Sequence, residues 1–174
     1  MLRTWMPMAL GLLGACAGAA ADSPLFEPIA SVLQHPRCLN CHTVTDYPRQ
    51  GDARVRHLQS VIRGADGHGA PTLQCAACHQ TANTGDGFVP GAGDWHLAPL
   101  SMGWEGLSAA EICAAIQDPT RNGGRTLDQV LQHMETSPLV LWAWSPGTGR
   151  DPPPVAQDVF VQDLQAWAAA GAPC

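Results

Sequence analysis

Two short segments carry the residues best suited to chemistry, Cys38–His42 (CLNCH) and Cys75–His79 (CAACH). Both have the pattern C-x-x-C-H, which is the attachment signature of c-type haem. Two thiols three positions apart can form thioethers with the two vinyl groups of one haem, and the adjacent histidine can bind its iron. The spacing therefore predicts two haem c groups. Their thioether residues would be Cys38, Cys41, Cys75 and Cys78, and their proximal iron ligands His42 and His79.

The same four cysteines fit two other chemistries. Two C-x-x-C pairs can form a four-cysteine zinc-binding module, and each pair by itself can act as a redox dithiol. The gap between the pairs is longer than the usual spacing of a zinc ribbon. Neither alternative requires a histidine directly after both pairs, so the pattern favours haem and leaves zinc and dithiol chemistry as alternatives.

Each haem iron would have a sixth position, and the group that occupies it decides the chemistry. A strong ligand there favours electron transfer, whereas an open position favours catalysis or gas binding. Met102 lies in an extended, proline-containing loop after the second motif and is one predicted distal ligand. His57 stands at the start of an apolar run after the first motif and is the other. His96 is the next candidate.

The first 21 residues have the pattern of an export signal. A positive start at Arg3 is followed by an apolar run from Trp5 to Leu13 and by small residues at 19–21. The run is too short to cross a bilayer as a helix. We therefore expect a signal peptide over residues 1–21 and a periplasmic protein. Leu13–Cys16 also resembles a lipobox, which would instead end the signal before Cys16 and anchor the chain by a lipid; both processing routes stay open.

Charge narrows the classes of partner. Of the nine basic residues only Arg3 precedes residue 22. The chain from residue 22 onward therefore holds eight arginines and all fifteen acidic residues. A net acidic chain without a basic stripe argues against nucleic acid as a partner. It is compatible with docking to a redox protein that presents a positive patch.

The cysteine count predicts one disulfide. Of seven cysteines, Cys16 falls in the targeting segment and four belong to the C-x-x-C-H motifs. Cys113 and Cys174 remain and are expected to pair by elimination. An oxidising compartment outside the cytosol favours this bond, with two buried free thiols as the alternative.

The remaining pattern predicts helices separated by long loops. Apolar spacing indicates a short helix over 28–34, capping boxes begin helices at Ser108 and Thr126, and Phe160, Leu164 and Trp167 share one face of a last helix. Residues 43–73 and 85–103 are rich in glycine and proline, and no useful alternation predicts strands. We therefore expect an all-α, cytochrome c-like fold over residues 22–174, with short helices and long loops around two covalent haems and a helical C-terminal half.

Several further segments resemble one family. They are Arg63-Gly64, Trp95–Pro99, Met102–Trp104, Asn122–Arg125 and Trp142–Gly147. Together with the haem motifs they resemble a family of small exported bacterial dihaem c-type cytochromes, often labelled as a subunit of an isoquinoline 1-oxidoreductase. The resemblance spans nearly all of residues 22–174. It implies an electron-accepting subunit or partner of an exported molybdenum hydroxylase, and the chain itself shows no molybdopterin or iron–sulfur site.

The sequence is consistent with three functions. The leading hypothesis is a periplasmic dihaem electron carrier, not itself catalytic, with a ligand at both sixth positions. The second is a small peroxidase-like haem catalyst with one open iron. The third is a binding module that uses Trp142, Trp144 and Trp167 as an interface, against which stands ordinary packing of these side chains around haem and helices.

Overall fold

The computed structural model describes residues 23–174. The expected signal peptide over residues 1–21, with its alternative lipid site at Cys16, lies outside the described residues. Within residues 23–174, no helix combines the length and the hydrophobicity that a membrane span requires.

Within residues 23–174, six α-helices and three short 3₁₀ helices account for the regular structure around the core. The α-helices are α1 (Glu27–Leu33), α2 (Pro36–Leu39), α3 (Ala109–Gln117), α4 (Leu127–Thr136), α5 (Pro138–Leu141) and α6 (Gln157–Ala169). The 3₁₀ helices are η1 (Cys75–Ala77), η2 (Leu100–Met102) and η3 (Trp142–Trp144).

The two expected capping boxes are confirmed. The side chain of Ser108 accepts a hydrogen bond from the backbone of Glu111, whose carboxylate accepts one back, and α3 begins there. Thr126 and Gln129 make the same reciprocal pair at the start of α4. Each box satisfies two backbone donors that a helix end otherwise leaves open. The two helices therefore begin where the sequence predicts.

Four strands of two residues each form two hairpins that the sequence did not predict. β1 (Arg49–Gln50) pairs antiparallel with β2 (Val55–Arg56), and β3 (Gly69–Ala70) pairs antiparallel with β4 (Leu73–Gln74). A two-residue strand is too short to show the alternation that identifies strands in a sequence. Residues 23–174 thus combine helices and long loops with two small sheets, which lie between α2 and α3 in the sequence and depart from the all-α expectation.

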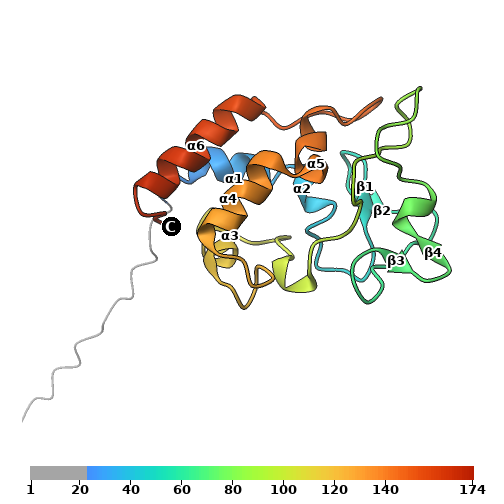
Figure 1. The fold of residues 1–174 in the computed structure, drawn as a ribbon, viewed down its shortest axis with the longest axis horizontal. Coiled ribbons are helices and arrows are strands. Elements are labelled where there is room, and N and C mark those ends of the chain that lie inside the picture. The colour runs from blue at the N-terminus through green and yellow to red at the C-terminus, as the bar shows by residue number, and fades with distance from the viewer. Residues whose placement is uncertain (1–22) are drawn as a thin grey trace, which may run out of the picture.

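The helical half is built around the contact of the first and last helices. The rings of Phe26 and Trp167 lie 5.2 Å apart, and both side chains are buried. The backbone amide of Ser23 donates to the carbonyl of Cys174 at 3.1 Å, and Cys174 forms a disulfide with Cys113 in α3. Figure 1 shows α1, α3, α4 and α6 gathered on one side, the four strands on the other, and α2 between them.

Buried charged side chains hold the loop half together where regular structure is sparse. The guanidinium of Arg63 is 7 % exposed and donates to the carbonyls of Thr43, Thr45 and Ala98. The carboxylate of Glu105 accepts hydrogen bonds from Thr43 and from two arginines of the β1–β2 hairpin. These bonds fix the course of the loops that carry the candidate site.

Candidate functional site

The first C-x-x-C-H motif forms one tight turn that leaves α2. The ring of His35 caps α2 by accepting a hydrogen bond from the backbone amide of Arg37. The amides of Cys41 and His42 then donate to the carbonyl of Cys38 at 3.1 and 2.9 Å. This turn directs both cysteines and the histidine at one cavity, which all three line.

That cavity penetrates the helical half and is mainly apolar. Its walls come from α1, α2, the loop over 96–104, α4, α5, η3 and α6, and include Val32, Leu33, Val130, Leu139, Val140 and Phe160. Two buried donors among the lining residues have no hydrogen-bond partner, Nε of Arg37 and Nε1 of Trp104. Buried donors are almost always paired. An apolar cavity that contains two unpaired donors therefore suits a flat apolar ligand that carries carboxylates.

The second motif forms the same turn on a different support. The β3–β4 hairpin runs directly into η1, and the amide of Cys75 donates to the carbonyl of His68 at 2.8 Å. The amides of Cys78 and His79 donate to the carbonyl of Cys75 at 3.2 and 2.9 Å. Although their flanking sequences differ, the two motifs therefore share one backbone geometry.

The two motif histidines also share their surroundings. Nδ1 of His42 lies 2.8 Å from the carbonyl oxygen of Met102, and its ring stacks on Trp104 with centroids 3.5 Å apart. Nδ1 of His79 lies 2.7 Å from the carbonyl oxygen of Pro90, and its ring stacks on Trp95 at 4.4 Å. A carbonyl oxygen can only accept, so Nδ1 is the protonated nitrogen and Nε2 keeps its lone pair. This is how proteins present a histidine to a metal ion.

Burial keeps both imidazoles neutral. Desolvation lowers the pKa of His42 to about 3, although its hydrogen bond to Met102 opposes the shift. Desolvation lowers the pKa of His79 as well, again against a hydrogen bond to the backbone. Metal ligation requires the unprotonated nitrogen, so both side chains are poised for it at neutral pH.

The geometry disfavours the zinc alternative. Over residues 23–174, the group of three or more histidine, cysteine or acidic side chains whose ligand atoms converge within 4.8 Å is that of His68, Asp94 and His96. The four motif cysteines therefore do not converge on one point.

The rings of His57 and His79 lie close together. His57 directly follows β2, and the two ring centroids are 6.1 Å apart with the planes at 74°. Nδ1 of His57 is buried and has no hydrogen-bond partner, and desolvation and then the charge of His79 lower the pKa of His57. Two imidazoles that bind one metal ion from opposite sides, at about 2 Å each, have centroids roughly 6 Å apart. The structure thus brings the predicted distal ligand to the second motif.

The backbone of Met102 lies at the Nδ1 edge of His42, which is an unfavourable position for the distal ligand that the sequence predicted. Its side chain is buried and lines the cavity, but its backbone oxygen is bonded to Nδ1, on the edge of the ring away from Nε2. A sixth ligand would have to lie beyond Nε2 and across the iron. The structure therefore disfavours Met102 as the distal ligand and gives its backbone a part in orienting His42.

Helix α4 brings two other side chains with lone pairs to the same cavity, Met134 and His133. Met134 is 5 % exposed and packs in the core. From the sequence alone, a methionine on the apolar face of an amphipathic helix predicts only core packing. The cavity that Met134 shares with His42 is visible only in the tertiary structure.

Two tryptophans connect the motifs. Trp95, which stacks on His79, meets the ring of Trp142 edge-on with centroids 4.8 Å apart, and Trp142 lines the cavity of the first motif. The indole nitrogen of Trp142 donates to Asn83, while that of Trp144 donates to the carbonyl of Val155. Trp167 is fully buried. These contacts account for the C-terminal tryptophans as packing and weigh against an interface made of them.

Several apolar side chains close in sequence to the second motif, or to residues that contact it, are exposed. Val55 and Leu58 flank His57, Leu73 precedes Cys75, and Phe88 stands two positions before Pro90, the partner of His79. All four are exposed, Leu58 at 75 % and Phe88 at 64 %. The second motif, with Cys78 exposed, is therefore less enclosed than the first, whose cysteines line the cavity.

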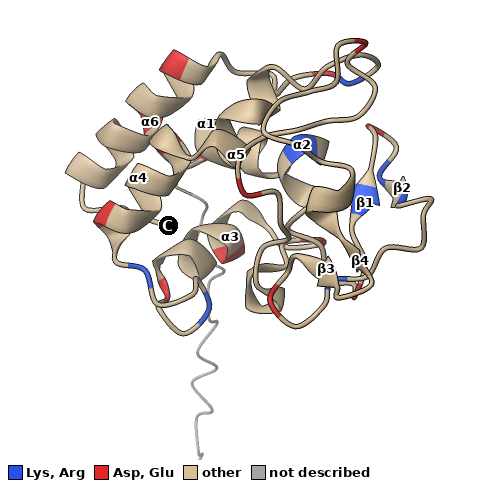
Figure 2. Cartoon of the chain, turned by 45° about the vertical axis from the view of Figure 1, so that its right-hand side comes forward, with Lys and Arg blue, Asp and Glu red and all other residues tan. Residues whose placement is uncertain are grey.

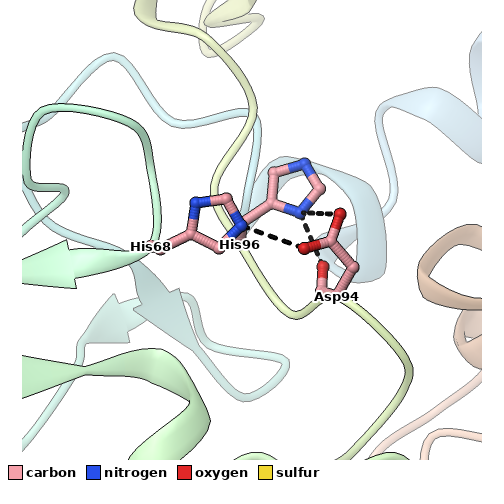
Figure 3. A group of neighbouring side chains, drawn as sticks. All are labelled: His68, Asp94 and His96. Carbon is pink, nitrogen blue, oxygen red and sulfur yellow. Dashed lines mark hydrogen bonds and ion pairs between the residues drawn. The ribbon is translucent and has the colours of Figure 1, made fainter.

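His96 belongs to a cluster beside the cavity that it also lines (Figure 3). Its Nδ1 donates to the backbone oxygen of Asp94 at 2.6 Å. Nε2 of His68 lies 3.0 Å from the carboxylate of Asp94, and this hydrogen bond raises the pKa of His68 and lowers that of Asp94. The ring of His96 is therefore held by Asp94 rather than directed at His42.

The chain matches no protein-family model, no curated protein and no solved structure. Its function is therefore inferred from the chemistry and geometry of these residues.

Proposed function

We propose that the chain is an exported dihaem c-type cytochrome that transfers electrons. The proximity of His57 to His79 carries the proposal, because ring centroids 6.1 Å apart would allow both imidazoles to hold one iron. The identical turns of the two motifs extend the same chemistry to His42. Covalent haem would give each site a one-electron redox centre whose potential depends on the axial ligands and on burial.

The residues of the chain hold, orient and shield the two groups. Each cysteine pair supplies the covalent attachment. The carbonyls of Met102 and Pro90 fix the tautomer and the angle of the two proximal imidazoles. At the first motif the apolar walls exclude water, and the unpartnered donors of Arg37 and Trp104 would meet the propionates.

The sixth ligands are proposed to differ between the two sites. For the second iron we assign His57. For the first we assign Met134, because the described ring contacts of His42 include Trp104 and no second imidazole, and Met102 lies on the unfavourable side. A methionine ligand raises the reduction potential relative to histidine. Electrons would then pass from the second site to the first, with Trp95 and Trp142 between them.

An electron carrier is favoured over a peroxidase-like catalyst because each site has a side chain suited to its sixth position. Figure 2 shows the basic segments of the described chain scattered over α2, β1 and the loop before α4, without a continuous strip. This distribution fits a positively charged redox partner. The resemblance in sequence makes an exported molybdenum hydroxylase the partner class to examine first.

The haem content tests the proposal directly. Protein produced in a host with haem-attachment machinery should carry two haems, counted by mass and by absorbance. Carbon monoxide added to the reduced protein should leave the spectrum unchanged if both sixth positions are held. A colourless product at the bare polypeptide mass would exclude the proposal, and a large carbon monoxide shift would favour the peroxidase-like alternative.

The ligand assignment at the first iron predicts opposite results for two methionine variants. Met134→Ala should abolish the weak charge-transfer band that methionine ligation gives to oxidised haem and open that iron to carbon monoxide. Met102→Leu keeps the backbone carbonyl that orients His42, so this matched control should retain the band. Loss of the band in Met102→Leu, with retention in Met134→Ala, would reverse the assignment.

A further inference from the structure

We propose that His68, Asp94 and His96 form a site for a divalent first-row transition-metal cation, separate from the two haem irons. The three side chains come from two loops, and one ligand atom of each lies within 4.8 Å of the others. Figure 3 shows both imidazoles directed at the carboxylate of Asp94. The proposal does not depend on the haem assignment.

The two distances from the imidazoles to the carboxylate of Asp94 are close to those around a bound cation. Nε2 of His68 is 3.0 Å from one carboxylate oxygen of Asp94, and Nδ1 of His96 is 3.5 Å from the other. Ligands that bind one ion at about 2.0–2.1 Å stand roughly 3.0–3.4 Å from one another in tetrahedral or octahedral geometry. A cation would thus replace the proton between His68 and Asp94, and Nδ1 of His96 would exchange its hydrogen bond to the backbone oxygen of Asp94 for the cation.

The loops are held together without the cation. The amide of Leu97 donates to the carbonyl of Gly67 at 2.9 Å. Gly67 has a φ of +87°, and a Cβ there would come within 2.6 Å of the carbonyl oxygen of Leu97. This close approach places His68 and His96 with their rings stacked, centroids 5.0 Å apart. The donor set is therefore largely preorganised, which lowers the entropic cost of binding.

A second carboxylate lies behind His68, whose Nδ1 has no hydrogen-bond partner among the described residues. Nδ1 of His68 lies 3.4 Å from Oδ1 of Asp66, the oxygen that accepts a hydrogen bond from the His68 backbone. With Nδ1 turned to Asp66, Nε2 is the nitrogen that faces Asp94. A carboxylate behind a histidine is the usual support of a metal-binding imidazole.

Ligand chemistry selects the class of cation. Two imidazoles and one carboxylate suit zinc, copper, nickel and iron, whereas magnesium and calcium prefer oxygen donors alone. Asp94 is largely exposed, so water can complete the coordination. The cation would link the loop that carries His68, just before the second motif, to the loop that carries Asp94, Trp95 and His96. It would thereby stabilise the part of the chain that lies between the two C-x-x-C-H motifs in space.

Calorimetric titration of the purified full-length protein with Zn²⁺, after treatment with a chelator, tests the site. We expect one equivalent to bind, with Mg²⁺ giving no heat. His68→Gln and Asp94→Asn should each weaken Zn²⁺ binding at least tenfold, as expected for the loss of one of three ligands. Asp163→Asn, a carboxylate on α6 outside the cluster, is the matched control and should bind like the wild type.

Two outcomes would overturn the proposal. The first is that the wild-type protein binds no Zn²⁺, or that the two cluster variants bind Zn²⁺ as tightly as the control variant. The other is a His96→Gln variant that binds Zn²⁺ normally but has an altered haem spectrum, since His96 would then serve an iron instead. Because the haem count is measured on the same samples, failure of this site is distinguishable from failure of the haem assignment.

Discussion

Removing the first pair of thiols, in Cys38→Ala/Cys41→Ala, should cost the protein one haem and much of its stability. The cavity at this motif is walled by helices from both ends of the chain, including α1, α4 and α6. Leaving it unfilled compares with deleting a large buried aromatic side chain, which costs about 3–5 kcal/mol. At this chain length that corresponds to a fall in Tm of about 6–20 °C.

The matched variant Cys75→Ala/Cys78→Ala should also lose one haem, but with a much smaller fall in Tm. The second motif lies on a hairpin among exposed side chains, and the main hydrophobic cluster is formed by other residues. Haem absorbance and thermal melting on the two variants provide the comparison. Equal losses of Tm would show that the first haem is not part of the core, and an unchanged haem count in either variant would refute the attachment sites.

Removing the disulfide should have the second largest effect on stability. Cys113 and Cys174 are 61 residues apart, and closing a loop of that length stabilises a fold by about 4 kcal/mol in the chain-entropy model. The double variant Cys113→Ala/Cys174→Ser should lose about that much free energy of unfolding, measured by denaturant titration. Alanine is chosen for the fully buried position, where a hydroxyl would add an unpaired polar group.

The haem content of this variant should not change, because neither cysteine belongs to a motif. Other contacts still hold the C-terminus, among them the hydrogen bond from the indole of Trp167 to the carbonyl of Pro173 and that from Gln117 to Ala172. The wild type treated with a reductant should show the same loss of stability. A difference below about 1 kcal/mol would mean that these contacts, and not the covalent bond, hold the C-terminus.

Features that depend on neighbouring residues could be predicted from the sequence. The capping boxes at Ser108 and Thr126 use partners three residues away, and the buried face of α6 repeats with the helical period. The pairing of Cys113 with Cys174 followed from counting, because the other cysteines had local assignments. The tight turns at the two motifs likewise depend on hydrogen bonds within five residues.

Only the tertiary structure decided which distant groups meet. The carbonyl that orients His42 comes from Met102, a residue 60 positions away. Met134 reached the same cavity because α4 packs across it. His68, Asp94 and His96 drew together because Gly67 permits two loops to touch. Such contacts depend on how loops close and helices pack, and no periodicity or spacing along a single sequence encodes that arrangement.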